Sequence, residues 1–154
     1  MAYQKLQAGR ALLVVPSDTI NIPNIAAITR SGTTTSTTTL SLIDTAGNFI
    51  AKRVNVGDIV YSGVIAAKVT EVSSATTLLV TTSIPSGAAY TIYSEKDNPS
   101  NGCVLYCGGE GDIEVVTVGG DIVTFYGMPT GQFVPVQVLK VKATSTATNI
   151  LALW

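Results

Sequence analysis

Apolar and polar residues alternate in short runs along most of this 154-residue chain. Alternation with a period of two is typical of strands that bury one face of a sheet. Gly, Pro, Ser and Asn separate the runs, as tight turns between strands require. The 3.6-residue period of an amphipathic helix is almost absent. The pattern therefore predicts an all-β protein.

The clearest hairpin signal lies in the last third of the chain. Two apolar strands at residues 113–118 and 122–126 are separated by the turn Gly119-Gly120-Asp121, which is typical of an antiparallel pair. Residues 30–39 are rich in Ser and Thr and lack an apolar face, so we expect either an exposed hairpin or a mobile loop there. The remaining expected strands cover residues 11–15, 19–22, 25–28, 40–45, 49–53, 54–61, 66–72, 76–82, 89–93, 104–106, 133–141 and 150–154.

The middle of the chain is expected to fold separately from its two ends. A series of short strands runs from residue 49 to residue 93, and closure into a barrel would remove their exposed edges. The polar stretch 95–101 follows them as a linker. We therefore predict two lobes: a β-sandwich-like flanking lobe made of residues 1–25 and 101–154, and an inserted lobe, a small β-barrel made of residues 26–100.

The C-terminus stays apolar to its last side chain, in the run Ile150-Leu151-Ala152-Leu153-Trp154. Chain ends are usually polar and frayed unless they are tied to the rest of the fold. This end is therefore expected to be a strand docked into a sheet or into a subunit interface. That expectation favours an assembly component over a free-standing catalyst.

Composition narrows the class of partner. Charged residues make up 12% of the chain, about half of the usual 25%, so we expect partners to cover much of the surface. Mean hydropathy is +0.40, but no apolar run approaches the ~18 residues of a membrane helix. The net charge of −1 and the scattered basic residues argue against nucleic acid as a partner.

The N-terminus lacks the layout of a signal peptide, so we expect a chain made in a cytoplasm and starting as written.

The sequence offers little for catalysis. Histidine, the commonest general base, is absent. Cys103 and Cys107 lie in one expected strand, about 13 Å apart, too far for a disulfide, so we expect buried free thiols. Glu110, Asp112 and Glu114 could together hold Ca²⁺ but are more simply a solvated strand edge. The Gly-rich run 108–111 lacks the Lys and Ser/Thr of a phosphate loop. We expect no enzyme activity, no metal and no cofactor.

The flanking segments carry a set of matching runs, among them residues 14–19, 102–106, 111–120 and 129–138. These runs resemble the head spike base and capsid decoration proteins of tailed phages and gene transfer agents. The run Val14-Val15-Pro16-Ser17-Asp18-Thr19 matches the short strand and turn that open this family. In the family this turn leads quickly into the next strand, whereas here roughly 75 residues intervene, consistent with an insertion. The other matching runs are residues 102–106, 111–120, 123–125, 129–138, 143–144 and 146–154.

The insertion has four runs that carry a resemblance of their own, at residues 55–60, 67–72, 76–80 and 89–93. They resemble the small barrels found across phage virion proteins. Together the two resemblances imply a structural role in the virion and a location on the capsid surface. Its partners would be the major capsid protein and further copies of itself, with a spike or fibre protein as a further candidate. By analogy with capsid cement proteins, we favour a trimer slightly over a pentamer as the oligomeric state.

Three hypotheses follow from different classes. The first is a capsid decoration protein, a cement or head spike base that stabilises the shell through interface burial and strand addition. The second is a tail, connector or fibre-base component with the same fold. The third is a carbohydrate-binding module, for which Tyr90 and Tyr93 flank a face but point to opposite sides of a strand. For the first, the expected interface residues are Phe125, Tyr126, Phe133, Ile150, Leu151, Leu153 and Trp154, with core positions as the alternative for Phe125 and Phe133. On this hypothesis, deleting residues 151–154 should abolish assembly or particle binding while the inserted lobe stays folded.

Overall fold

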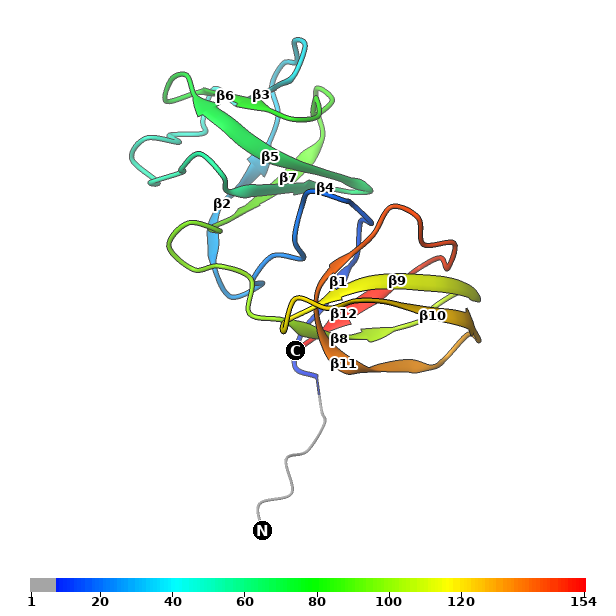
Figure 1. Cartoon of the computed structure of the whole chain (residues 1–154). Coiled ribbons are helices and arrows are strands. Elements are labelled where there is room, and N and C mark those ends of the chain that lie inside the picture. The colour runs from blue at the N-terminus through cyan, green and yellow to red at the C-terminus, as the bar shows by residue number, and fades with distance from the viewer. Residues whose placement is uncertain (1–7) are drawn as a thin grey trace. The chain divides into compact units, whose positions relative to one another are not determined.

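The computed structural model describes residues 8–154, and all regular structure in that range is β (Figure 1). The described chain forms two compact units. The flanking lobe consists of residues 8–18 together with Asn101–Trp154, and the inserted lobe is Thr19–Ser100. The first boundary follows Asp18 rather than residue 25, because residues 19–25 pack with the insertion.

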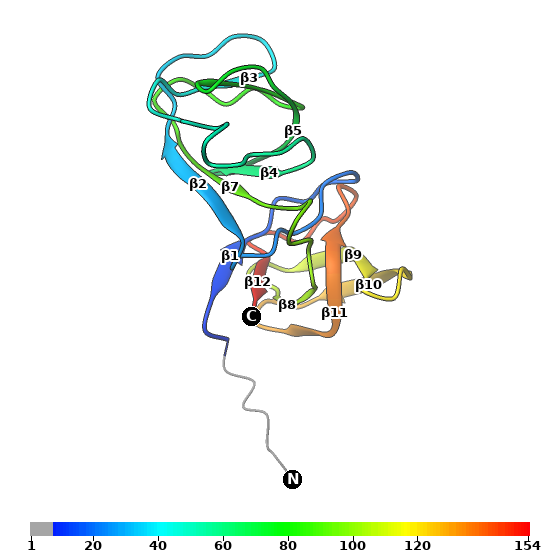
Figure 2. The ribbon, with the colours of Figure 1, turned by 90° about the vertical axis from the view of Figure 1, so that its left-hand side faces the viewer.

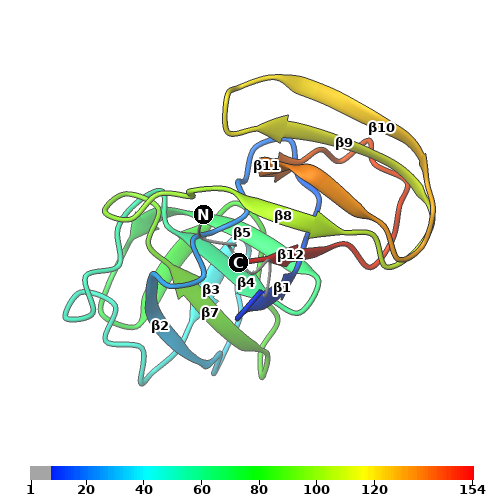
Figure 3. The same cartoon turned by 90° about the horizontal axis from the view of Figure 1, so that it is seen from below.

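The flanking lobe is one antiparallel sheet of six strands in the order β1-β12-β8-β11-β9-β10 (Figure 3). Strand β11 serves both halves of the sheet, because its first residues pair with β8 and its last residues pair with β9. Irregularities in both pairings accompany this switch of partners. The strands are β1 (Ala11–Leu13), β8 (Cys103–Tyr106), β9 (Gly111–Thr117), β10 (Ile122–Met128), β11 (Phe133–Val141) and β12 (Leu151–Leu153).

One face of this sheet forms the core of the flanking lobe. Leu105, Ile113 and Ile150 are among its largest fully buried side chains, and burying each contributes about 1.5–3 kcal/mol. Smaller residues complete the core: Val14, Cys103, Cys107, Val115, Val134, Val138, Val141, Ala147 and Ala152. The alternation of buried and half-buried residues in β8 follows the period of two expected of a strand.

The inserted lobe is a second antiparallel sheet of six strands, in the order β2-β7-β4-β5-β6-β3. It curls round its core until the chain just after β2 reaches β3, where the Thr35 N–H donates to the Ile43 carbonyl over 2.8 Å (Figure 2). The strands are β2 (Ile28–Thr33), β3 (Ser41–Ile43), β4 (Ile59–Ser62), β5 (Ile65–Val72), β6 (Thr77–Val80) and β7 (Ala89–Tyr93).

Several segments of the inserted lobe differ from the sequence prediction. The expected strands at 19–22 and 25–28 are absent apart from Ile28, which begins β2, and the strand expected at 54–61 begins only at Ile59, in β4. Residues 28–33 form β2 and pair with β7, so this part of the Ser/Thr-rich segment is neither a loop nor a separate hairpin. Residues 49–53 form a turn instead of the expected strand, flanked by the positive φ angles of Asn48 and Arg53. From this turn Phe49, fully buried, enters the core of the barrel.

Glu95 ties the two ends of the inserted lobe together. Its Oε1 accepts a hydrogen bond from the Asn21 side chain over 3.0 Å, and its Oε2 accepts one from the Ser100 N–H over 3.0 Å. Asn21 lies near the start of the insertion and Ser100 is its last residue. The insertion therefore begins and ends at one place, as a lobe inserted into another domain must.

Candidate interaction surface

Four strands of the flanking lobe place apolar side chains in a row on the face opposite the core. Leu13 pairs with Leu151, Leu151 with Tyr106, and Tyr106 with Phe133. Residues that lie directly opposite each other in antiparallel strands project from the same face. The neighbouring row, Leu12, Ala152, Leu105 and Val134, projects toward the core.

A second row continues this apolar face. Leu153 pairs with Val104 on one side and with Ala11 on the other. We call the set Leu13, Val104, Tyr106, Phe133, Leu151 and Leu153 the outer apolar face. Its rings pack edge to face, since the Tyr106 and Phe133 centroids are 5.4 Å apart. Phe133 is nevertheless 55% exposed and Leu13 39% exposed, so this face keeps apolar surface that a partner could cover.

The seven residues expected at an interface do not all lie on one surface of the structure. Phe133, Leu151 and Leu153 come together on the outer apolar face. Ile150 is 2% exposed and belongs to the core, which corrects its assignment to an interface. Strand alternation explains the difference: Ile150 and Leu151 are neighbours, so they project from opposite faces.

The other three predicted residues lie elsewhere. Trp154 pairs through its backbone with Arg10, and alternation puts its half-buried ring on the core side of the sheet. Phe125 lies opposite the buried Ile113 and is half-buried on the same side. Tyr126, 80% exposed, lies on β10 at the free edge of the sheet.

Sequence reasoning missed Leu13, Val104 and Tyr106. Each belongs to a short apolar strand in which successive residues face opposite ways, so the sequence alone does not show which residues face outward. The available signal was the alternation in β8, where Val104 and Tyr106 interleave with Cys103, Leu105 and Cys107. The three interleaved residues are all buried.

Of the clustered acidic residues, Asp112 and Glu114 form hydrogen bonds within the fold, whereas Glu110 is exposed. Asp112 accepts a hydrogen bond from the Gly127 N–H over 2.8 Å, and Glu114 accepts one from the Thr144 hydroxyl. No group of three or more metal-binding side chains occurs among residues 8–154. At the lobe boundary, the Lys142 ammonium lies 2.9 Å from the Asp18 carboxylate. Its hydrogen bond, helped by the Ala143 N–H, lowers the pKa of Asp18.

Both cysteines are buried free thiols. The Cys103 thiol donates to the Val138 carbonyl and the Cys107 thiol to the Gly109 carbonyl. Burial raises the pKa of the Cys103 thiol to about 12. Because the reactive species of cysteine is the thiolate, Cys103 is chemically inert at neutral pH.

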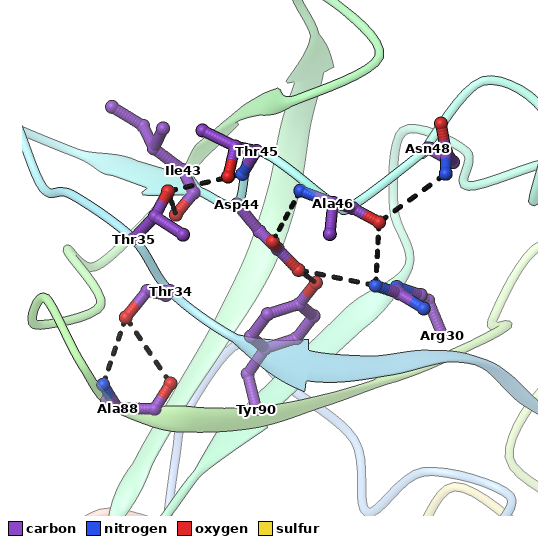
Figure 4. A network of polar contacts seen from close by, with 10 residues as sticks. All are labelled: Arg30, Thr34, Thr35, Ile43, Asp44, Thr45, Ala46, Asn48, Ala88 and Tyr90. Carbon is purple, nitrogen blue, oxygen red and sulfur yellow. Dashed lines mark hydrogen bonds and ion pairs between the residues drawn. The ribbon is translucent and has the colours of Figure 1, made fainter.

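A polar network in the inserted lobe surrounds the buried carboxylate of Asp44 (Figure 4). Asp44 is 2% exposed and accepts hydrogen bonds from the Tyr90 hydroxyl over 2.6 Å and from the Ala46 N–H over 2.8 Å. Arg30 reaches the same carboxylate at 3.4 Å and donates to the Ala46 carbonyl over 2.8 Å. Both Asp44 oxygens accept hydrogen bonds, so the network stabilises the barrel, although the buried Arg30 Nε has no hydrogen-bond partner among the described residues.

The electrostatics of this network are set by burial and by hydrogen bonding together. Burial alone would raise the pKa of Asp44, but the hydrogen bonds from Tyr90, Ala46 and Arg30 outweigh it and lower that pKa. Burial first, and then the bond to Asp44, raise the pKa of Tyr90 well above its ordinary value. Asp44 is therefore charged and Tyr90 neutral across the physiological range.

The two tyrosines considered for carbohydrate binding are both buried. Tyr90 is committed to Asp44, and Tyr93 packs edge to face on Tyr61 with centroids 6.1 Å apart. Neither ring offers a flat exposed platform for a sugar.

Comparisons with known proteins identify no relative: no family model, no curated protein and no solved structure matches this chain. Among the described residues, no helix has the length and hydropathy needed to cross a bilayer.

Proposed function

We propose that this protein is a structural component of a virus particle, a capsid decoration protein of the cement or head spike base kind. It is made in the host cytoplasm, binds the outer surface of the shell formed by the major capsid protein, and stabilises that shell. It acts by burying surface against its partner, without chemistry, metal or cofactor.

The outer apolar face is the observation that carries this proposal. It spans four neighbouring strands, and the sequences of β1, β8 and β12 contain no charged residue. Two of its members, Leu13 and Phe133, are too exposed to serve mainly as core residues. Aromatic side chains contribute much of the binding energy of protein interfaces, and Phe133 with Tyr106 provides such a pair.

The resemblance of the flanking segments to head spike base and decoration proteins supports the same reading and names the partner. A shell repeats its binding site many times, so contacts of modest individual strength give firm attachment when several copies bind together. The scattered basic residues make the packaged nucleic acid an unsuitable partner.

Co-sedimentation with shells assembled from the major capsid protein of the same virus tests the proposal. We expect the protein to pellet with the shells, and Phe133→Glu to weaken binding by at least about tenfold, as loss of an interface anchor does. Val64→Glu is the matched control, because Val64 is 78% exposed but lies in the inserted lobe. Binding to purified tails or fibres in place of shells, or to none of them, would refute the proposal.

A further inference from the structure

Strand β10 forms a free edge of the flanking sheet and is unusually apolar for such a position. Among residues 8–154 it pairs with β9 on one side and with no strand on the other (Figure 3). Edge strands are normally protected by charges, by proline or by short length. β10 has seven residues, and no charged residue occurs between Asp121 and Lys140. Its Ile122 is 63% exposed.

The hydrogen bonding of the β9–β10 hairpin shows which backbone groups face outward. The Thr117 N–H donates to the Asp121 carbonyl, which makes these two residues a hydrogen-bonded pair. Bonded and non-bonded pairs alternate along an antiparallel ladder. Val123 and Phe125 therefore bond to β9, whereas the N–H and C=O groups of Ile122 and Thr124 point away from it.

We propose that β10 pairs with β10 of a second copy of this chain, antiparallel and centred on Thr124. In this register Thr124 lies opposite Thr124 of the second copy, Ile122 lies opposite its Tyr126, and Val123 lies opposite its Phe125. The outward backbone groups of both Thr124 residues form the central hydrogen-bonded pair. Two six-stranded sheets become one continuous sheet across a two-fold axis.

A second copy is the occupant because the strand is complementary to itself in this register. Ile122 and Tyr126, the two most exposed large apolar residues of β10, cover each other, and aromatic with β-branched residues are favourable cross-strand pairs. On the other face, the half-buried Phe125 covers Val123, which is 39% exposed. The two Asp121 carboxylates lie at opposite ends of the ladder, so like charges do not meet.

This inference is independent of the proposed function, because it concerns the protein alone and uses a different surface. It also differs from the oligomer suggested by the family resemblance, since a two-fold pairing of β10 yields a dimer and neither a trimer nor a pentamer.

Light scattering after gel filtration, over a range of concentrations of the full chain, provides the first test. The wild-type mass should rise toward that of a dimer. Thr124→Pro should weaken dimerisation at least tenfold without unfolding the lobe, because the N–H that it removes points away from β9 and proline is accepted on such an edge. A wild-type protein that stays monomeric throughout, or that forms trimers or pentamers, would overturn the proposal.

Crosslinking provides a second test that does not depend on a proline variant. Thr124→Cys places a thiol at the two-fold axis, so a short bis-maleimide should join two chains. Val64→Cys is the matched control, since Val64 is the more exposed site but lies outside β10. The native thiols are buried, so the wild-type chain gives the background. Equal crosslinking of the two variants would contradict pairing through β10.

Discussion

The hydroxyl of Tyr90 donates a 2.6 Å hydrogen bond to the Asp44 carboxylate and thereby links β7 to the chain that follows β3. The contact is tightly packed on the side that faces Gly32. A Cβ atom on Gly32 would lie 2.7 Å from Asp44 Oδ2 and 2.8 Å from the Tyr90 hydroxyl oxygen. With the bonds between Thr35 and Ile43, this interaction holds the barrel of the inserted lobe together where its sheet order ends.

Tyr90→Phe should therefore destabilise the inserted lobe by about 1.5–3 kcal/mol at pH 7, the cost of losing a hydrogen bond to a charged group. The effect should shrink in alkali. Because the folded-state pKa of Tyr90 is raised, its contribution is complete below the ordinary value near 10 and is lost as pH rises through the folded pKa. Denaturant unfolding followed by circular dichroism, at pH 7 and again in alkali above pH about 10, measures the stability difference between the variant and the wild type.

Trp154 supplies an internal control for that experiment. It is the single tryptophan of the chain and lies in the flanking lobe, so its fluorescence reports on that lobe. A Tyr90→Phe variant with unchanged unfolding by circular dichroism, or with its main shift in Trp154 fluorescence, would contradict the assigned role of Tyr90.

Asp44 should make the inserted lobe sensitive to acid. The pKa of its carboxylate is lowered in the folded state, so its contribution to stability is present above the ordinary value near 3.9 and is lost as pH falls through the folded pKa. Asp44→Asn should lower the stability at pH 7 and flatten its decline below pH about 4. Acid titration of the unfolding midpoint of both proteins checks this, and parallel declines would refute it.

Alanine substitutions at two glycines of the flanking lobe should distinguish the cost of backbone strain from the cost of a steric clash. Gly111 and Gly120 both have positive φ, +148° and +91°, but a Cβ on Gly111 would lie 2.5 Å from the Ala147 backbone nitrogen whereas Gly120 faces open space. Gly120→Ala should cost about 1 kcal/mol, and Gly111→Ala at least about 2 kcal/mol more. Unfolding followed by Trp154 fluorescence measures both. Equal losses would show that the packing of Gly111 contributes nothing.

Deleting residues 151–154 should do more than remove an interface. Strand β12 lies between β1 and β8 in the sheet order, so its loss deprives both neighbours of their backbone partners. We expect the flanking lobe to unfold and the inserted lobe, whose hydrophobic core is self-contained, to remain folded. Limited proteolysis should leave a protected fragment close to residues 19–100. A truncated chain as resistant as the full one would contradict this.

Local pattern was enough to predict the class of fold and its strongest hairpin, β9 with β10, because alternation and glycine turns act over a few residues. The docking of the C-terminal run into a sheet followed from its composition and is confirmed by the pairing of Leu151 with Tyr106. The turn at Phe49 was missed because its apolar residues resemble a strand, while the positive φ angles around it involve Asn48 and Arg53 rather than glycine.

The candidate site was less accessible from sequence. Leu13, Tyr106, Phe133 and Leu151 come from four separate segments, and only the pairing register of the sheet brings them into one row. A shift of one residue would exchange the buried and outward sets. That sensitivity explains why Ile150 was expected at an interface although its neighbour Leu151 is the residue that faces outward.

Hydrogen–deuterium exchange of the full chain, with and without shells of the major capsid protein, tests the central proposal most directly. We expect new protection in β1, β8, β12 and the beginning of β11, the strands that carry the outer apolar face, while the inserted lobe exchanges as in the free protein. Protection confined to the inserted lobe, or no change at saturating shells, would contradict the account.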